Sequence, residues 1–235
     1  MKALRLHARG GPEQLVYEEA PKPTPGCGEV RVRVFAAGIT PAELTWEQTY
    51  TTADGHSRIP SIPGHDVSGV VDSVGPEVLS LEEGEEVYGL TPFSRDGSAA
   101  EFMTLPAIDL APHPKSLDHI QAAAVPLSAL TAWQALFEHG HLVAGNKVLI
   151  HGAAGGVGAY AVQLARAHGA EIIATSSARH VAFLKSLGVH TIIDYEKEPF
   201  DKVVKDVDIV IDSIGGETRD RSWQVMRQGA TLITL

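Results

Sequence analysis

Cysteine is nearly absent from this sequence of 235 residues, in which Cys27 is the only example. A single cysteine cannot form an internal disulfide, so we expect a protein of a reducing compartment, the cytoplasm. No apolar run is long enough to cross a bilayer. The first residues, Met1-Lys-Ala-Leu-Arg-Leu6, also lack the apolar core of a secretory signal peptide.

Positive charge is scarce as well. The chain has 19 Lys and Arg against 29 Asp and Glu, a formal net charge of −10, and it contains no basic run. This balance argues against a nucleic-acid-binding surface. The hydrophobic content of 44% is nevertheless that of a globular protein with a substantial core, in one large or two ordinary domains. We therefore expect a small-molecule ligand, with no nucleic-acid or membrane partner.

Glycine is plentiful, and the most informative segment is the glycine-rich Lys147–Gly158, KVLIHGAAGGVG. The apolar, β-branched run Val148–Ile150 predicts a buried strand, and Ala159–His168 predicts the helix that follows the glycines. Such a turn lets a ligand approach the backbone, and the helix N-terminus offers free N–H groups to a pyrophosphate. The segment therefore predicts a dinucleotide-binding turn.

The spacing of the glycines is not the literal fingerprint of such turns. Gly152, Gly155 and Gly158 recur at intervals of three, and Ala153 stands where the first glycine of GxGxxG is usual. Taken alone, the motif is also compatible with an ordinary strand-to-helix turn.

The sequence that follows favours the nucleotide-binding interpretation, because strand-like segments recur in order. They are Glu171–Thr175, Thr191–Tyr195, Asp208–Ser213 and Thr231–Leu235. Helix-like segments lie between them, notably His180–Leu187 and Glu217–Arg227. Alternating strands and helices imply right-handed βαβ crossovers and a parallel sheet. We therefore predict a Rossmann fold.

The segment after the second predicted Rossmann strand bears on the choice of cofactor. NAD-binding sites normally place a carboxylate there to bind the ribose 2′-hydroxyl. This chain instead has Thr175-Ser-Ser-Ala-Arg179, whose hydroxyls and guanidinium suit a 2′-phosphate. The segment favours NADPH over NADH. The alternative is a solvated loop in which Ser177 merely caps a helix.

Residues 1–120 differ from the rest, being rich in proline and glycine with short alternating runs such as Glu29–Phe35. Val67–Val74 and Glu86–Leu90 predict further short strands. A helical stretch, His119–His139, leads into the Rossmann part. We predict a mostly β domain over residues 1–120 and a Rossmann domain over residues 121–235.

Several passages, in this order, carry a resemblance to a known family. They are Met1-Lys-Ala-Leu4, Ala36-Ala-Gly-Ile-Thr-Pro41, Ile62-Pro-Gly-His-Asp-Val-Ser-Gly-Val-Val71, Gly84-Glu-Glu-Val-Tyr-Gly89, Leu130-Thr-Ala-Trp-Gln-Ala-Leu136 and His151–Gly158. With them the chain resembles the medium-chain dehydrogenase/reductase superfamily, in its zinc-independent quinone oxidoreductase (zeta-crystallin-like) group.

The resemblance implies an α/β protein, a GroES-like β domain followed by a Rossmann doubly wound parallel sheet. Family members continue past the strand that Thr231–Leu235 matches, with a sixth strand and a segment that contributes to the subunit interface. By this resemblance we expect a Rossmann domain that is truncated at the C-terminus and ends at its fifth strand. The family also implies a homodimer.

The zinc chemistry of related alcohol dehydrogenases has few candidate ligands here. Their structural zinc needs four cysteines and their catalytic zinc three protein ligands, whereas this chain has one cysteine, Cys27. Thr40 stands where the zinc enzymes have a cysteine ligand. His65-Asp66 resembles their Gly-His-Glu motif, but one histidine beside a carboxylate is a poor zinc site. We therefore predict no metal.

The family also implies site residues in both domains. The loop after Ala36–Pro41 lines the substrate site, where Thr40, Trp46 and Tyr50 are our catalytic candidates. Tyr50 would donate a hydrogen bond to the acceptor oxygen and Trp46 would stack on a flat ring. The alternative is that both aromatic residues simply pack the small domain.

Cofactor-binding candidates follow the same logic. Our candidates are Thr131, Gly155, Gly156, Val157, Ser176, Ser177, Arg179 and Tyr195. Thr131 and Tyr195 match family residues near the nicotinamide and the adenosine. The alternatives for these two are a helix hydroxyl that is satisfied locally and an aromatic residue at a strand end.

Together these features predict an NADPH-dependent oxidoreductase that transfers hydride to a quinone or an α,β-unsaturated carbonyl without zinc. One alternative is an enoyl or alkenal reductase of the same superfamily. Another is a non-catalytic NADPH-binding protein.

Overall fold

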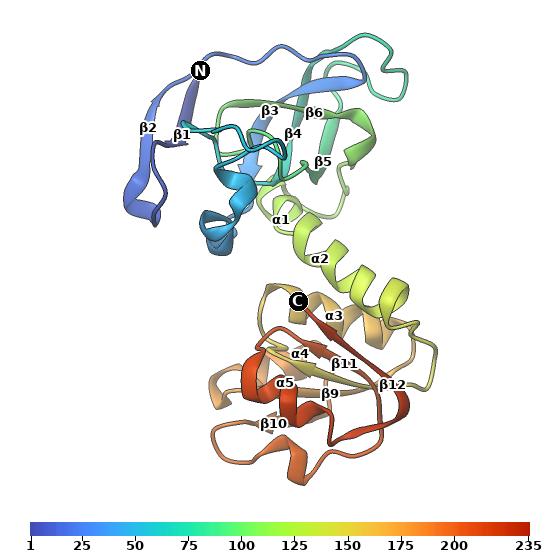
Figure 1. Ribbon diagram of the computed structural model, residues 1–235. Helices are drawn as coiled ribbons and strands as arrows, with labels where there is room; N and C mark the ends of the chain where they lie inside the picture. Colours follow the sequence, from blue (N-terminus) through green and yellow to red (C-terminus); the bar gives the residue numbers. More distant parts are fainter. The chain divides into compact units, whose positions relative to one another are not determined.

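The structure is a computed structural model that describes residues 1–235. The chain divides into two units, Met1–Leu127 and Ser128–Leu235. The division falls within α2 (Pro126–Trp133), while α1 (His119–Ala123) packs against strands of the first unit (Figure 1). No helix combines the length and the apolar character that a membrane span requires.

The first unit is built on an antiparallel sheet of five strands (Figure 1). Their order is β6 (Phe102–Pro106), β3 (Glu29–Ala37), β4 (Asp66–Val74), β5 (Glu86–Leu90) and β7 (Leu110–Pro112). A separate hairpin pairs β1 (Lys2–Leu6) with β2 (Leu15–Glu19). The alternation predicted for β3 is confirmed, because Val30 and Val32 are fully buried.

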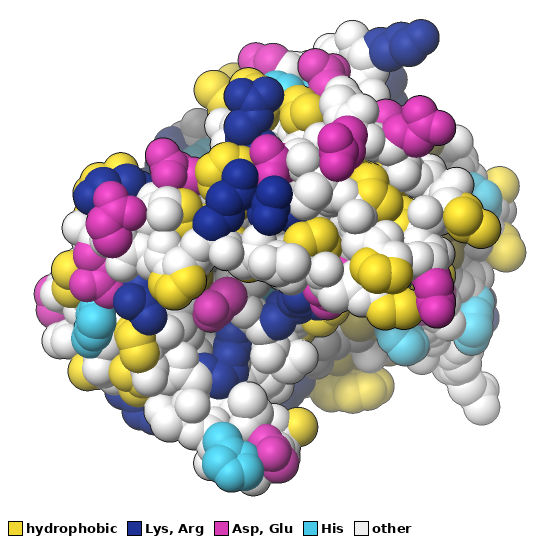
Figure 2. All heavy atoms as spheres, turned by 90° about the horizontal axis from the view of Figure 1, so that it is seen from above, with side chains coloured by type: hydrophobic (Ala, Val, Ile, Leu, Met, Phe, Trp, Pro, Cys, Tyr) yellow, Lys and Arg dark blue, Asp and Glu magenta, His cyan; other side chains and the backbone are white.

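Charged side chains of both signs alternate over the face of the molecule seen in Figure 2, so that face has no basic patch.

Two short 3₁₀ turns, Pro41–Thr45 and Glu47–Thr49, follow β3 and form the predicted substrate loop.

The second unit is a parallel sheet of five strands. Their order is β10 (Thr191–Asp194), β9 (Glu171–Ser176), β8 (Lys147–His151), β11 (Val207–Asp212) and β12 (Met226–Thr234). Its helices are α3 (Gly156–Ala167), α4 (Val181–Ser186) and α5 (Gly216–Ser222). The predicted Rossmann architecture is confirmed.

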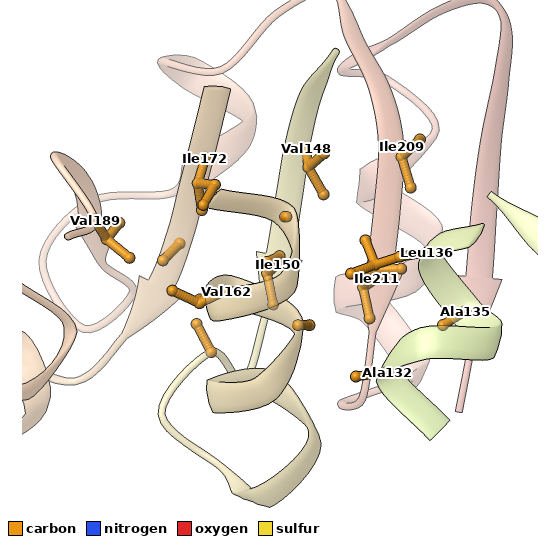
Figure 3. Packing of buried hydrophobic residues seen from close by; sticks show 14 of the residues in the cluster. Ala132, Ala135, Leu136, Val148, Ile150, Val162, Ile172, Val189, Ile209 and Ile211 are labelled. Carbon is orange, nitrogen blue, oxygen red and sulfur yellow. The ribbon is translucent and has the colours of Figure 1, made fainter. Parts of the chain in front are cut away.

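Both faces of this sheet are buried, which explains its nearly continuous apolar strands. Along β8, Val148 and Ile150 enter the core cluster of Figure 3, together with Val162 of α3. Leu149, between them in sequence, belongs to a second cluster with Val210. Consecutive strand residues therefore fill opposite layers of the unit.

Two predicted helices differ from those in the structure. The predicted helix Glu217–Arg227 is wrong at its end, because α5 stops at Ser222 and Met226 already pairs with β11. Val225, three residues after the end of α5, is buried in the core, and the chain then continues as a strand of the sheet. The predicted helical stretch His119–His139 is confirmed in outline but is interrupted before Pro126, which lacks an N–H and starts α2. The stretch ends in a π-helical turn, Gln134–His139.

Candidate functional site

The glycine-rich turn joins β8 to α3 and leaves little room for side chains. Gly152 has a φ of +67°, a conformation that non-glycine residues rarely adopt. A Cβ at Gly158 would lie 2.7 Å from the Ala153 Cα and closer still to the Gly152 carbonyl oxygen. Gly158 therefore lets α3 pack directly on the turn, the role of the third glycine in a dinucleotide-binding fingerprint.

The first turn of α3 is open to a ligand. Its N-cap, Gly155, supplies no side-chain cap, and Gly155 and Gly156 are both exposed. Val157, by contrast, packs partly against the core. Uncapped N–H groups at the start of a 12-residue helix suit an anion such as a pyrophosphate.

A cavity of about 640 Å³ opens beside this turn, within the second unit. It lies at the carboxyl ends of the parallel strands, where open α/β sheets bind ligands. Five of the predicted cofactor residues line it: Gly155 of the turn, Ser176, Ser177, Arg179 and Tyr195. The structure thus gathers residues from three separate segments.

The loop after β9 carries the polar groups of the cavity. The Ser176 hydroxyl donates to the Ser177 carbonyl at 3.1 Å. The Ser177 hydroxyl is buried without a hydrogen-bond partner and does not cap the following turn. Arg179 is exposed, its Nε lies 3.0 Å from His180 Nε2, and it forms no ion pair. A hydroxyl without a partner beside a guanidinium without a carboxylate suits an anionic ligand.

His151, the last residue of β8, also lines the cavity, and sequence reasoning did not identify it. Burial lowers its pKa to about 4, so the imidazole is neutral at physiological pH. The Ser222 hydroxyl donates to the Thr218 carbonyl at 2.7 Å, so it accepts from His151 Nε2 at 3.0 Å. Nδ1 then accepts from the Thr175 hydroxyl at 2.9 Å. These hydrogen bonds connect the C-terminal ends of β8, β9 and α5.

The sequence interpretation also missed other lining residues, including Phe200, Thr218 and Arg221. They come from the turn after β10 and from α5. The signal available in the sequence was their place after the ends of parallel strands, but no spacing motif identifies them.

Tyr195 and Thr131 are cofactor candidates that both lie in the second unit. Tyr195 follows β10, is 58% exposed, and lines the cavity. Thr131 lies half-buried on α2 and does not line it.

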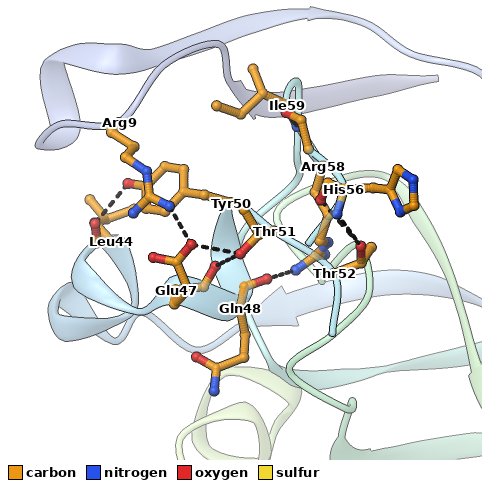
Figure 4. A network of polar contacts seen from close by, with 11 residues as sticks. Arg9, Leu44, Glu47, Gln48, Tyr50, Thr51, Thr52, His56, Arg58 and Ile59 are labelled. Atoms are coloured by element: carbon orange, nitrogen blue, oxygen red, sulfur yellow. Dashed lines mark hydrogen bonds and ion pairs between the residues drawn. The ribbon is translucent and has the colours of Figure 1, made fainter. Parts of the chain in front are cut away.

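Tyr50, in the first unit, has its hydroxyl engaged with the main chain. The side chain is 2% exposed, and the hydroxyl donates to the Leu44 carbonyl at 2.7 Å (Figure 4). The Arg9 guanidinium lies 4.7 Å from its ring centroid and pairs with Glu47 at 2.5 Å. This arrangement corresponds to the alternative interpretation, in which the Tyr50 side chain packs the small domain.

Trp46 belongs to an aromatic group with His65 and Phe93. Its ring stacks on His65 at 6.0 Å and meets Phe93 edge-on at 5.1 Å. Trp46 and Thr40 are both half-buried, so part of each remains accessible. Of the three catalytic candidates, these two keep a surface that a ligand can touch.

His65 of this group also forms a buried pair with Glu43. The Glu43 carboxyl accepts the Gly64 N–H at 3.0 Å, and its other oxygen lies 3.6 Å from His65 Nε2. Burial raises the pKa of Glu43 to about 7, and burial with the nearby Arg58 lowers the pKa of His65 to about 4. The pair is therefore not an ion pair at neutral pH or below. Burial also raises the pKa of Asp66 to about 6, opposed by its 2.6 Å bond from the Leu127 N–H.

Glu43→Gln is expected to stabilise the protein at alkaline pH. A raised folded-state pKa means that Glu43 favours folding at low pH and loses this contribution as pH rises from about 4.5 to about 7. Relative to wild type, the free energy of unfolding of the variant should increase between pH 5 and pH 8, by on the order of 2–3 kcal/mol. Urea unfolding of both proteins at the two pH values measures this difference.

Glu83→Gln is the matched control, because Glu83 is an exposed carboxylate on the same unit without an ion pair. Its difference from wild type should stay nearly constant from pH 5 to pH 8. His65 and Asp66 are present in every variant, so their own titration largely cancels. A constant difference for Glu43→Gln would contradict the raised pKa.

The residues around His65 do not fit a zinc ion. No three His, Cys, Asp or Glu side chains are placed to share a metal. The one cysteine, Cys27, is exposed in a turn, and Asp66 already accepts a backbone N–H. Zinc in catalytic sites needs three protein ligands.

Comparison with known proteins agrees with this architecture. Residues 26–115 match the family model described as alcohol dehydrogenase GroES-like domain, and residues 156–235 match the one described as zinc-binding dehydrogenase. The chain belongs to the medium-chain dehydrogenase/reductase superfamily, in its quinone oxidoreductase-like group, a family of oxidoreductases that depend on a nicotinamide dinucleotide.

Among its relatives, the quinone oxidoreductase of Mus musculus is 31% identical over 100% of this chain and 73% of its own length. The 2-methylene-furan-3-one reductase of Solanum lycopersicum is 36% identical over 88% of this chain, which spans only 54% of that relative. The solved structure of the quinone oxidoreductase from Coxiella burnetii superposes with a TM-score of 0.92 at 31% identity, covering 100% of this chain and 75% of that one.

Proposed function

We propose that this chain is an NADPH-dependent oxidoreductase that transfers hydride to a quinone or an α,β-unsaturated carbonyl without zinc. The observation that carries the proposal is the loop after β9. Ser176, Ser177 and Arg179 line the cavity, and no carboxylate stands within Thr175–Arg179. A carboxylate there would favour a ribose hydroxyl and repel a 2′-phosphate.

The residues of the second unit fit the parts of a dinucleotide. The uncapped N–H groups at the start of α3, beside Gly155 and Gly156, would hold the pyrophosphate. Ser177 and Arg179 would hold the 2′-phosphate, since a guanidinium binds phosphate with paired, charge-assisted hydrogen bonds. Tyr195 would lie beside the adenosine. The dinucleotide supplies the hydride when bound, and these residues bind and orient it.

The proposal leaves out zinc because the donor set around His65 is too small. Without a Lewis acid, the acceptor must take hydride directly, as quinones and conjugated carbonyls do when they lie against a nicotinamide. Two relatives, a quinone oxidoreductase and a 2-methylene-furan-3-one reductase, support these acceptor classes. The half-buried ring of Trp46 offers a flat surface for such an acceptor, and the Thr40 hydroxyl a hydrogen bond.

Parallel titration of the purified chain with NADPH and NADH tests the proposal, with heat or tryptophan fluorescence as the signal. We expect NADPH to bind at least about tenfold more tightly, the effect of one strong charge-assisted contact to the 2′-phosphate. A preference for NADH would refute the cofactor assignment. Tight NADPH binding without oxidation by a panel of quinones and enones would instead favour a non-catalytic binding protein.

A further inference from the structure

The cavity of the second unit contains an arginine whose guanidinium is held in a fixed plane. Arg221, on α5, lies with its guanidinium carbon 5.1 Å from the centroid of the Phe200 ring. It also pairs with Asp201, whose side chain is only 9% exposed. The ring below and the carboxylate beside it restrict the guanidinium, and the Arg221 side chain, which is 30% exposed, is among the residues that line the cavity.

The Phe200 ring is in turn held in place by its contact with His151. Phe200 is 4% exposed, and its ring meets the His151 ring at 4.6 Å with an interplanar angle of 65°. His151 is anchored by the hydroxyls of Thr175 and Ser222. Arg221 and Phe200 together therefore form a rigid, layered wall, which we call the arginine floor of the cavity.

The order of the lining residues indicates which part of a ligand meets this floor. Pyrophosphate belongs at the glycine-rich turn after β8, and the adenosine ribose at the end of β9. The lining residues that remain come after β10 and β11, and they include Phe200, Thr218 and Arg221. The group of a dinucleotide beyond its adenosine ribose is the purine base.

We propose that Arg221, supported by Phe200, is the stacking surface for the adenine ring of the cofactor. This inference rests on the proposed function and extends it to a residue outside the glycine-rich turn and the serine loop. A guanidinium with one face on an aromatic ring stacks its other face on a second planar π system. Asp201 balances the charge of Arg221, so this arginine recognises a flat ring, whereas Arg179, which forms no ion pair, recognises a phosphate.

Two fragments of the cofactor test the assignment, 5′-AMP and adenosine 2′,5′-bisphosphate, with binding followed by calorimetry. Both contain adenine, and only the second contains the 2′-phosphate. We expect Arg221→Ala to weaken both fragments by a similar factor, on the order of tenfold, as for loss of one stacking surface. Arg221→Lys should bind almost as weakly as the alanine variant, because an ammonium keeps the charge without the plane.

Arg219→Ala is the matched control, since Arg219 lies on the same helix, pairs with Asp220 and does not line the cavity. It should bind both fragments like wild type. Because Arg221→Ala leaves the Asp201 carboxylate without its cation, the double variant Asp201→Asn with Arg221→Ala is measured beside it. The double variant should fold with a thermal midpoint near that of wild type and show the same loss of binding.

Two results would overturn the adenine assignment while leaving the proposed function intact. In one, wild type and the folded Arg221 variants bind both fragments equally well. In the other, only adenosine 2′,5′-bisphosphate is weakened and lysine restores it, which would make Arg221 a phosphate ligand. Failure of wild type to bind either fragment would instead refute the proposed function, and the adenine assignment with it.

Discussion

Replacing Arg179 with alanine is expected to weaken NADPH binding by roughly 10- to 100-fold, the range for loss of a charge-assisted contact to phosphate. NADH binding should change by less than about twofold, because NADH carries no 2′-phosphate for the guanidinium to meet. Arg179 lines the cavity and forms no ion pair, so its removal leaves no buried carboxylate unpaired. Dissociation constants for both cofactors, measured in the same buffer, give the comparison.

Lys185→Ala separates this direct contact from the general electrostatic field. Lys185 is an exposed cation on α4, the helix that follows the Arg179 turn, and it does not line the cavity. This variant should retain the NADPH preference of wild type. Equal losses of NADPH and NADH affinity in Arg179→Ala would contradict a 2′-phosphate contact. A loss of NADPH affinity in Lys185→Ala as large as that in Arg179→Ala would attribute the preference to net charge instead.

The Rossmann unit can be predicted from the sequence because its signals are local. A strand buried on both faces is a continuous apolar run, as in Val148–Ile150, and the glycine-rich turn follows it directly. The loop Thr175–Arg179 was located by its distance from that turn alone. The wrong prediction for the end of α5 has a local cause as well. The predicted helix Glu217–Arg227 contains no proline or glycine to mark its true end at Ser222.

The remaining features depend on contacts between residues far apart in the sequence. Arg221 meets Phe200 and Asp201 only because α5 folds back on the turn after β10, and no spacing rule links them. Tyr50 is another example. Its amphipathic side chain is compatible with both a catalytic donor and a packed residue, and the carbonyl of Leu44 is what engages its hydroxyl.

Replacing Gly158 with alanine is expected to cost about 3 kcal/mol or more of folding stability and to abolish dinucleotide binding. The three atoms nearest to the new Cβ all belong to the backbone of Gly152 and Ala153, so no side chain can move aside to relieve the overlap. Relief requires α3 to move away from the turn, which displaces the N–H groups proposed to hold the pyrophosphate. Urea unfolding and NADPH titration measure the two losses.

Gly155→Ala is the informative comparison, because stability and binding should separate there. Its Cβ would approach a single atom, the Gly152 carbonyl oxygen at 3.2 Å, at an exposed position with an ordinary φ of −77°. The variant should fold with a loss of no more than about 1 kcal/mol yet bind NADPH poorly, since its methyl group occupies the path of the pyrophosphate. Gly26→Ala, at an exposed turn of the first unit with only the Glu29 side chain nearby, should change neither property. If Gly155→Ala bound NADPH like wild type, the pyrophosphate would not lie on this turn, and Gly158 would serve packing alone.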